Sequence, residues 1–180
     1  MMKATGIVRR IDDLGRIVIP KEIRRTLHIR ESDPLEIFTD REGQVILKKY
    51  SPIGEMTTFA KQYAESLAQV SGHATLIADR DQFIAVSGGC KQLLNKSVSR
   101  QLEEKVNNRV IAAKGDRNYV NIAEDIAVDY AWQLITPIIC EGDIIGSVIL
   151  LENDGKSKMG EVEQKLALSA AGFLGRQMEQ

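Results

Sequence analysis

Hydrophobic and polar positions alternate over short stretches in the first fifty residues, which is typical of β-strands. Residues 5–10 and 16–19 are rich in β-branched side chains, so we expect two short strands there. Asp12, Asp13 and Gly15 favour a turn between them. Pro20 ends the second strand because it lacks a backbone donor, and it suits the start of a helix over residues 20–27.

A β-hairpin is predicted next, because residues 35–39 and 44–48 flank a four-residue loop that contains Gly43. The first unit is thus expected to run strand, strand, helix, strand, strand. A unit of about fifty residues buries little apolar surface alone, so we expect an obligate dimer that shares strands. Ser51 and Pro52 mark its predicted end, which gives domains over residues 1–52 and 53–180.

The second domain combines helical and strand patterns. An amphipathic helix over residues 53–67 is followed by predicted strands over 73–78 and 82–87 and a mostly helical region over 91–113. Strands are expected over 119–122, 132–140 and 143–151, the last two joined by a tight turn at Glu141 and Gly142. A final helix begins at 159 or 160. This order predicts an antiparallel sheet with flanking helices, an α+β fold.

Charge is divided unevenly along the chain. The net formal charge is −1, yet residues 1–30 hold eight lysines and arginines against three acidic residues, a net charge of +5. Residues 1–50 carry +3, so the rest carries −4. A basic head on an acidic body indicates a polyanion partner for the head alone.

Several other classes of protein are not favoured by the sequence. Cys90 and Cys140 do not form a disulfide framework, and neither a secretory leader nor an apolar stretch of membrane-spanning length is evident, so a cytoplasmic protein without a membrane partner is expected. His28 and His73 lack zinc-site spacing, and the glycine motifs of nucleotide-binding enzymes are missing. We therefore expect no catalytic residue, no metal and no cofactor.

Four arginines are the strongest candidates for nucleic-acid contacts. Arg9 and Arg16 flank the first turn, and Arg24 and Arg25 lie beside the apolar stripe of the predicted helix. A guanidinium group suits both phosphate oxygens and the edge of guanine, and a dimer would double the set to eight. The competing interpretation is a merely solvated basic face. Asp12 interrupts the positive surface, unless it pairs with one arginine and orients it.

The segment ATGIVRRIDDLGRIVIPKEIRRTLHI, with DPLEIFTDREGQVILKKY after it, resembles the AbrB family of transition-state regulators from spore-forming bacteria. The resemblance covers about residues 2–50. It implies an N-terminal swapped-hairpin β-barrel built from two intertwined chains that binds double-stranded DNA. It also implies DNA contacts at Arg9, Arg16, Arg24 and Arg25, with Lys3 and Arg10 as additional phosphate contacts.

The two-domain layout and the final segment GEVEQKLALSAAGFLGRQMEQ are similar to sporulation regulators of this family that carry a C-terminal GAF domain. The resemblance implies a tetramer joined through GAF-like domains, activation and repression of sporulation genes in the forespore, and an unidentified small-molecule effector. The candidate ligand residues are Ser87, Gly88, Gly89, Tyr119 and Trp132. Each has a plainer interpretation as a connection or a core residue.

Two other functions remain open from the sequence. Related swapped-hairpin modules occur in antitoxins that neutralise a toxin partner, although the folded second domain is unlike the short tail of such antitoxins. The other is a signal receptor or enzyme with secondary DNA binding, for which the sequence offers no catalytic constellation.

Overall fold

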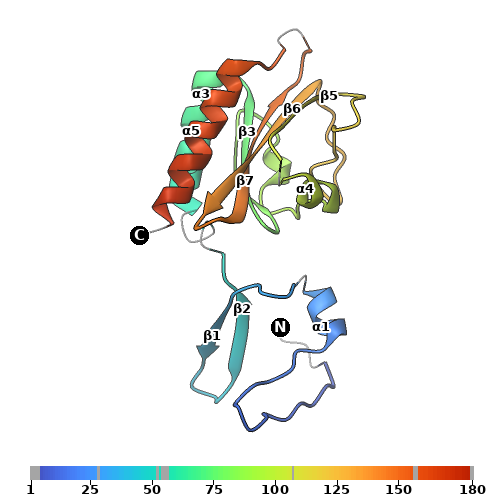
Figure 1. Ribbon diagram of the computed structural model, residues 1–180, viewed down its shortest axis with the longest axis vertical. Coiled ribbons are helices and arrows are strands. Elements are labelled where there is room, and N and C mark those ends of the chain that lie inside the picture. The colour runs from blue at the N-terminus through green and yellow to red at the C-terminus, as the bar shows by residue number, and fades with distance from the viewer. Residues whose placement is uncertain are drawn as a thin grey trace. The chain divides into compact units, whose positions relative to one another are not determined.

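The computed structural model of the chain describes residues 5–27, 29–51, 53, 57–106, 108–155 and 158–178. The chain divides into two compact units, Met1–Tyr50 and Ser51–Gln180, which are considered separately (Figure 1). Pro52, where the sequence places the end of the first domain, lies outside the described residues.

The first unit contains a short helix and a hairpin. Helix α1 (Lys21–Thr26) follows directly on Pro20, and strands β1 (Leu35–Thr39) and β2 (Val45–Lys49) pair antiparallel. The carboxylate of Asp40 accepts hydrogen bonds from the backbone of Glu42 at 3.0 Å and Gln44 at 2.9 Å, which closes the hairpin loop. The predicted helix and hairpin are confirmed.

The two strands predicted over residues 5–10 and 16–19 are wrong for the single chain, because neither stretch belongs to a sheet. A strand requires a partner to satisfy its backbone groups, and the described part of this chain supplies none for these residues. The turn between them is confirmed: the amide of Asp12 donates to Arg16 at 3.0 Å, and that of Gly15 donates to Asp12 at 3.0 Å.

The first unit buries no apolar side chain among its described residues. Val8 is 86% exposed, and Leu14, Val18, Ile37 and Val45 are also exposed. These side chains belong to both the extended N-terminal stretches and the hairpin. As a single chain, the unit therefore lacks the hydrophobic core that would stabilise it.

The second unit is built on a five-stranded antiparallel sheet in the order β4-β3-β7-β6-β5. Its strands are β3 (Ala74–Asp79), β4 (Phe83–Ser87), β5 (Val110–Ala113), β6 (Trp132–Cys140) and β7 (Asp143–Glu152). Glu141 and Gly142 both have positive φ, as a two-residue hairpin turn requires. The predicted antiparallel sheet is confirmed.

Two long helices, α3 (Thr57–Ser71) and α5 (Glu161–Gln177), lie side by side on one face of the sheet (Figure 1). Small side chains at Ala60, Ala64, Ala167 and Ala170 face a core that includes Ile77 and Ile138. At Gly175 a Cβ would lie 2.2 Å from the carbonyl oxygen of Ile139, so the helix packs against the backbone of β6. Both predicted helices are confirmed.

Helix α5 begins at a polar junction. Glu163 accepts a hydrogen bond from the amide of Gly160 at 2.7 Å, and this bond holds the pKa of Glu163 below its usual range. The same carboxylate lies 3.8 Å from Nε2 of His73, whose Nδ1 is 2.5 Å from Glu152. The junction thus joins the start of α5 to the ends of β3 and β7.

Short segments cover the other face: η1 (Lys91–Leu93), α4 (Arg100–Lys105) and the chain over residues 114–131. The prediction of a mostly helical region over 91–113 is wrong, since that stretch holds two short helical pieces and strand β5. The strand predicted over 119–122 is also wrong. Its backbone bonds to neighbouring loops, as where Ser99 donates to Ile122 at 2.9 Å, because this segment wraps over the core.

Candidate nucleic-acid interface

Asp12 organises the turn that carries Arg16. One carboxylate oxygen accepts the backbone amides of Arg16 at 2.7 Å and Leu14 at 3.0 Å, and the other lies 2.8 Å from Nε of Arg16. The amide of Arg16 is the largest cause of the lowered pKa of Asp12. The predicted pairing of Asp12 with an arginine is confirmed. The contact holds Nε of Arg16 and leaves the two terminal nitrogens of the guanidinium available for other partners.

Arg24 and Arg25 occupy the last turn of α1. The side chain of Arg24 is 34% exposed, and its Nη1 lies 3.8 Å from a carboxylate oxygen of Glu31. Its Nε is buried without a hydrogen-bond partner among the described residues. Arg25 is exposed. The helix therefore presents a partly buried guanidinium at Arg24 and a solvent-exposed one at Arg25.

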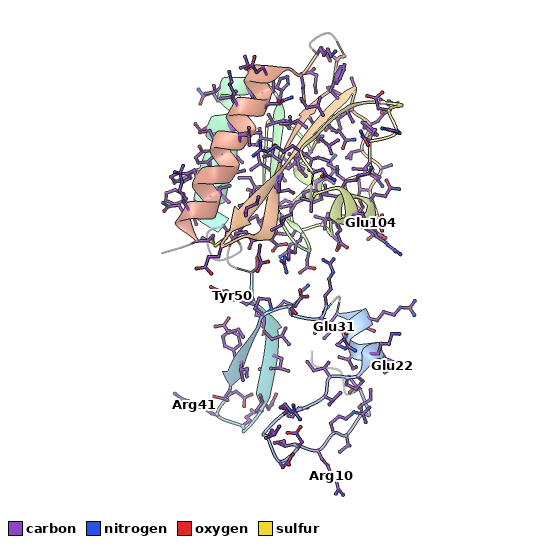
Figure 2. The ribbon with its side chains drawn as sticks, viewed as in Figure 1. Arg10, Glu22, Glu31, Arg41, Tyr50 and Glu104 are labelled. Carbon is purple, nitrogen blue, oxygen red and sulfur yellow. The ribbon has the colours of Figure 1, made fainter. Side chains whose placement is uncertain are left out.

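Arg9 and Arg10 lie on the extended stretch before the turn, and both are exposed. Arg9 donates to the carbonyl oxygen of Val8 at 3.3 Å, while Arg10 projects away from the unit (Figure 2). Lys3 lies outside the described residues. The described candidate arginines thus form two groups, one on the first loop and one on α1.

The candidate ligand residues of the second unit are not brought together. Gly88 packs against α3, since a Cβ there would lie 3.2 Å from Cβ of Ala68. Trp132 belongs to the same side of the sheet, with the ammonium of Lys158 at 5.7 Å from its ring. Tyr119 bonds through its hydroxyl to the backbone of Tyr130, which packs on the opposite side. Ser87 and Gly89 flank Gly88 where β4 ends.

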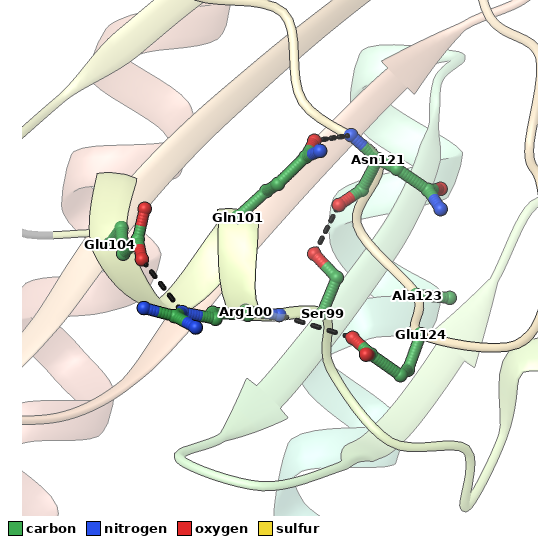
Figure 3. A pocket seen from close by; sticks show the side chains of 7 residues that line it. All are labelled: Ser99, Arg100, Gln101, Glu104, Asn121, Ala123 and Glu124. Atoms are coloured by element: carbon green, nitrogen blue, oxygen red, sulfur yellow. Dashed lines mark hydrogen bonds and ion pairs between the residues drawn. The ribbon is translucent and has the colours of Figure 1, made fainter.

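A polar pocket of 480 Å³ lies beside α4 (Figure 3). Its lining includes Ser99, Arg100 and Gln101 from one segment and Asn121 and Glu124 from another. Most of these groups bond to one another: Gln101 accepts from the amide of Asn121 at 2.9 Å, and the amide of Arg100 donates to Glu124 at 3.2 Å. None of the five candidate residues lines it. Sequence reasoning missed it because its two segments meet only through folding.

Cys90 and Tyr130 form a contact between the thiol and the phenol in the second core. Burial raises the pKa of both groups, so both stay protonated at neutral pH. Within the described ranges, no three His, Cys, Asp or Glu side chains gather closely enough to hold a metal ion. The described helices are also too short or too polar to cross a membrane.

Comparison with known families places both units. Residues 55–179 match the family model described as "Stage V sporulation protein T C-terminal, transcription factor". Over 180 residues the chain is 57% identical to stage V sporulation protein T of Bacillus subtilis (strain 168), an alignment that covers 99% of this chain and 100% of the relative. The chain belongs to the stage V sporulation protein T family.

Two further similarities concern the first unit of this family member. The chain is 42% identical over 109 residues to transition state regulatory protein AbrB of Bacillus subtilis (strain 168), with 61% of this chain and 94% of that protein covered. Residues 8–55 match the model described as "Antidote-toxin recognition MazE, bacterial antitoxin". The predicted AbrB-type first unit is thus confirmed.

The second unit of this stage V sporulation protein T relative has a GAF-like fold. It is similar to the GAF domain of an Acinetobacter phosphoenolpyruvate-protein phosphotransferase, with a TM-score of 0.56 and 13% identity. That alignment covers 68% of this chain and 81% of the solved chain. The likeness concerns the fold alone, and the predicted GAF-like architecture is confirmed.

Proposed function

We propose that this chain regulates transcription of sporulation genes by binding double-stranded DNA through residues 1–52. Family membership and the similarity to AbrB support this proposal. The observation that carries it is the turn at Asp12, which holds the exposed Arg16 in place. The arginines Arg9, Arg16, Arg24 and Arg25 contact DNA, and Lys3 and Arg10 add phosphate contacts.

The DNA-binding unit works as an intertwined dimer. Its exposed apolar side chains, among them Val8, Val18 and Val45, support this arrangement because a partner chain would bury them. Residues 5–10 and 16–19 then pair with strands of the partner, which supplies the ladder that the single chain lacks. Two copies of each arginine group face one DNA duplex.

The second unit, residues 53–180, joins two such dimers into a tetramer through the outer faces of α3 and α5. Val70 is 70% exposed and Val162 is 65% exposed, and Phe59 adds a third exposed apolar side chain on these helices. Linking two DNA-binding dimers raises avidity when both sites are in reach. The tetramer acts on the chromosome in the cytoplasm of the forespore, activates some genes and represses others, and responds to a small-molecule effector.

A second candidate function is toxin neutralisation. It is favoured by the match of residues 8–55 to the antitoxin model, since such modules combine DNA binding with a toxin partner. Co-purification of a stoichiometric small toxin with the full chain would support this function. Its absence from purified, DNA-binding protein would leave transcription regulation alone.

The proposed function is tested by Arg16→Ala and Arg24→Ala in the full chain. Each substitution removes two DNA contacts per dimer, so we expect affinity for operator DNA to fall at least about tenfold at fixed salt. Arg117→Ala, at an exposed position of the second unit, is the matched control and keeps full affinity. Sedimentation is expected to show the same oligomer for all variants. Unchanged DNA binding by both Arg16→Ala and Arg24→Ala would contradict the proposal.

A further inference from the structure

A second, smaller pocket of 150 Å³ lies on the face of the sheet that α5 covers. Its lining includes Ile111 of the edge strand β5, Leu134 and Thr136 of β6, and Gln164 and Leu168 of α5. Arg109, just before β5, and Val110 also line it. Helix α5 packs mainly on β6 and β7, so β5 extends beyond the helix and leaves this space at its flank.

Strand register explains why these side chains meet. Ile111 pairs with Leu134 and Val110 pairs with Ile135 in the antiparallel ladder. The next step of the same register brings Arg109 beside Thr136, and side chains at paired positions share a face. The arginine and the threonine therefore lie together on the face that carries α5.

Two polar side chains of this pocket, Thr136 and Arg109, form no hydrogen bond or ion pair with the described residues. Thr136 is only 2% exposed, yet its hydroxyl forms no hydrogen bond with any residue in the described part of the chain. The exposed Arg109 has no ion pair there either. A hydroxyl that has no protein partner and borders a cavity is free to hydrogen-bond a ligand, and an unpaired guanidinium suits an anion.

The remaining lining is mostly apolar. Val110, Ile111, Leu134 and Leu168 are apolar, Gln164 adds one amide, and no carboxylate contributes to the lining. A space of about 150 Å³ is comparable to the volume that a six-carbon ring occupies. The walls thus suit a short hydrocarbon tail, and the lack of a carboxylate disfavours a ligand that carries an ammonium group.

We propose that this pocket binds a small monocarboxylate with a short branched or linear tail of up to about six carbons. Arg109 pairs with the carboxylate, Thr136 donates its hydroxyl to it, and the tail packs on Ile111, Leu134 and Leu168. This assignment names the ligand class for the effector role proposed for the second unit and rests on that role. Binding itself is measured without DNA.

Isothermal titration calorimetry of isovalerate into the full chain tests the proposal. We expect saturable binding of one isovalerate per chain, with isoamyl alcohol binding at least about tenfold more weakly because it lacks the charge. Leucine is also expected to bind more weakly than isovalerate. No saturable isovalerate binding, or an alcohol or amino acid that binds as well, would overturn the proposal.

Substitutions in the lining test whether isovalerate binds in this pocket. Arg109→Gln is expected to weaken isovalerate binding at least about tenfold, and Thr136→Val and Leu168→Phe to weaken it by removing the hydroxyl and filling the pocket. Arg117→Gln is the control at an exposed arginine outside the pocket. Ligand-free thermal melting establishes that each variant is folded. Wild-type affinity in both Arg109→Gln and Leu168→Phe would overturn the assignment.

Separate variants distinguish the ligand site from the DNA site. Arg16→Ala is expected to retain isovalerate binding while it loses DNA affinity, and Arg109→Gln to retain DNA affinity in the absence of ligand. Loss of isovalerate binding in Arg16→Ala would overturn the placement of the ligand in the second unit.

Discussion

At the residue scale, the contact between Asp12 and Arg16 explains why an acidic residue lies within a basic surface: it orients the arginine. Sequence reasoning could propose this pair because both residues lie in one short turn, four positions apart. It could not propose that Glu31 lies 3.8 Å from Arg24, since that contact depends on how the chain leaves α1. Local pairs are predictable, whereas pairs across a chain reversal need the fold.

Asp12→Asn distinguishes orientation from simple charge. If Asp12 orients Arg16, the substitution weakens DNA binding several-fold even though it removes a negative charge. Because the pKa of Asp12 is lowered, the ion pair is present above its usual pKa and is lost only as the pH falls through the lowered value. The effect is therefore expected across neutral pH in a fluorescence anisotropy titration.

Asp13→Asn is the matched control, because Asp13 neighbours Asp12 and is exposed. It removes the same charge without releasing Arg16, so DNA binding is expected to tighten slightly. Equal tightening in both variants would show that Asp12 acts only through its charge.

At the element scale, hairpins were predictable and the covering segments were not. The turns at Gly43 and Gly142 depend on backbone conformations with positive φ, which glycine adopts without strain and which its presence therefore predicts. Residues 91–113 instead break into short pieces because Leu93, Leu102 and Val110 must each reach the buried side of the sheet. Tertiary packing determines this path of the chain, so the hydrophobic periodicity of the segment alone cannot predict it.

Two glycines of α5 test how closely this helix packs on the sheet. Gly175→Ala places a Cβ 2.2 Å from the carbonyl oxygen of Ile139, so we expect the free energy of unfolding to fall by about 1–3 kcal/mol. Gly172→Ala in the same helix meets nothing within 4 Å and is expected to raise it by up to about 1 kcal/mol. Urea unfolding of both variants measures the difference, and equal effects would contradict this packing.

At the scale of the whole molecule, charge and core point to different tasks for the two units. The first unit holds the basic excess and lacks a core, whereas the second buries two apolar clusters on either side of its sheet. The motif in the first unit was sufficient to propose the arginines, whose DNA contacts stay a prediction. The pocket residues could not be proposed from the sequence, because the pockets combine segments that the sequence keeps apart, such as Arg109 and Leu168.

Assembly of the proposed tetramer is tested at α3 and α5. The double variant Val70→Glu/Val162→Glu places charges on the exposed apolar positions of both helices, so we expect tetramers to separate into dimers without loss of folding. The double variant Val70→Ala/Val162→Ala is the milder control. Light scattering coupled to gel filtration measures the mass. A tetramer that persists in the glutamate variant would place the interface elsewhere.

The central claim is that paired arginines of a dimer bind DNA, and the salt dependence of binding tests it most directly. The eight contacts of the four arginines alone contribute about −7 to the slope of log K against log salt. Arg16→Ala removes two of these contacts and is expected to make the slope shallower by about 2. A wild-type slope shallower than about −2, or the same slope in wild type and Arg16→Ala, would contradict this account.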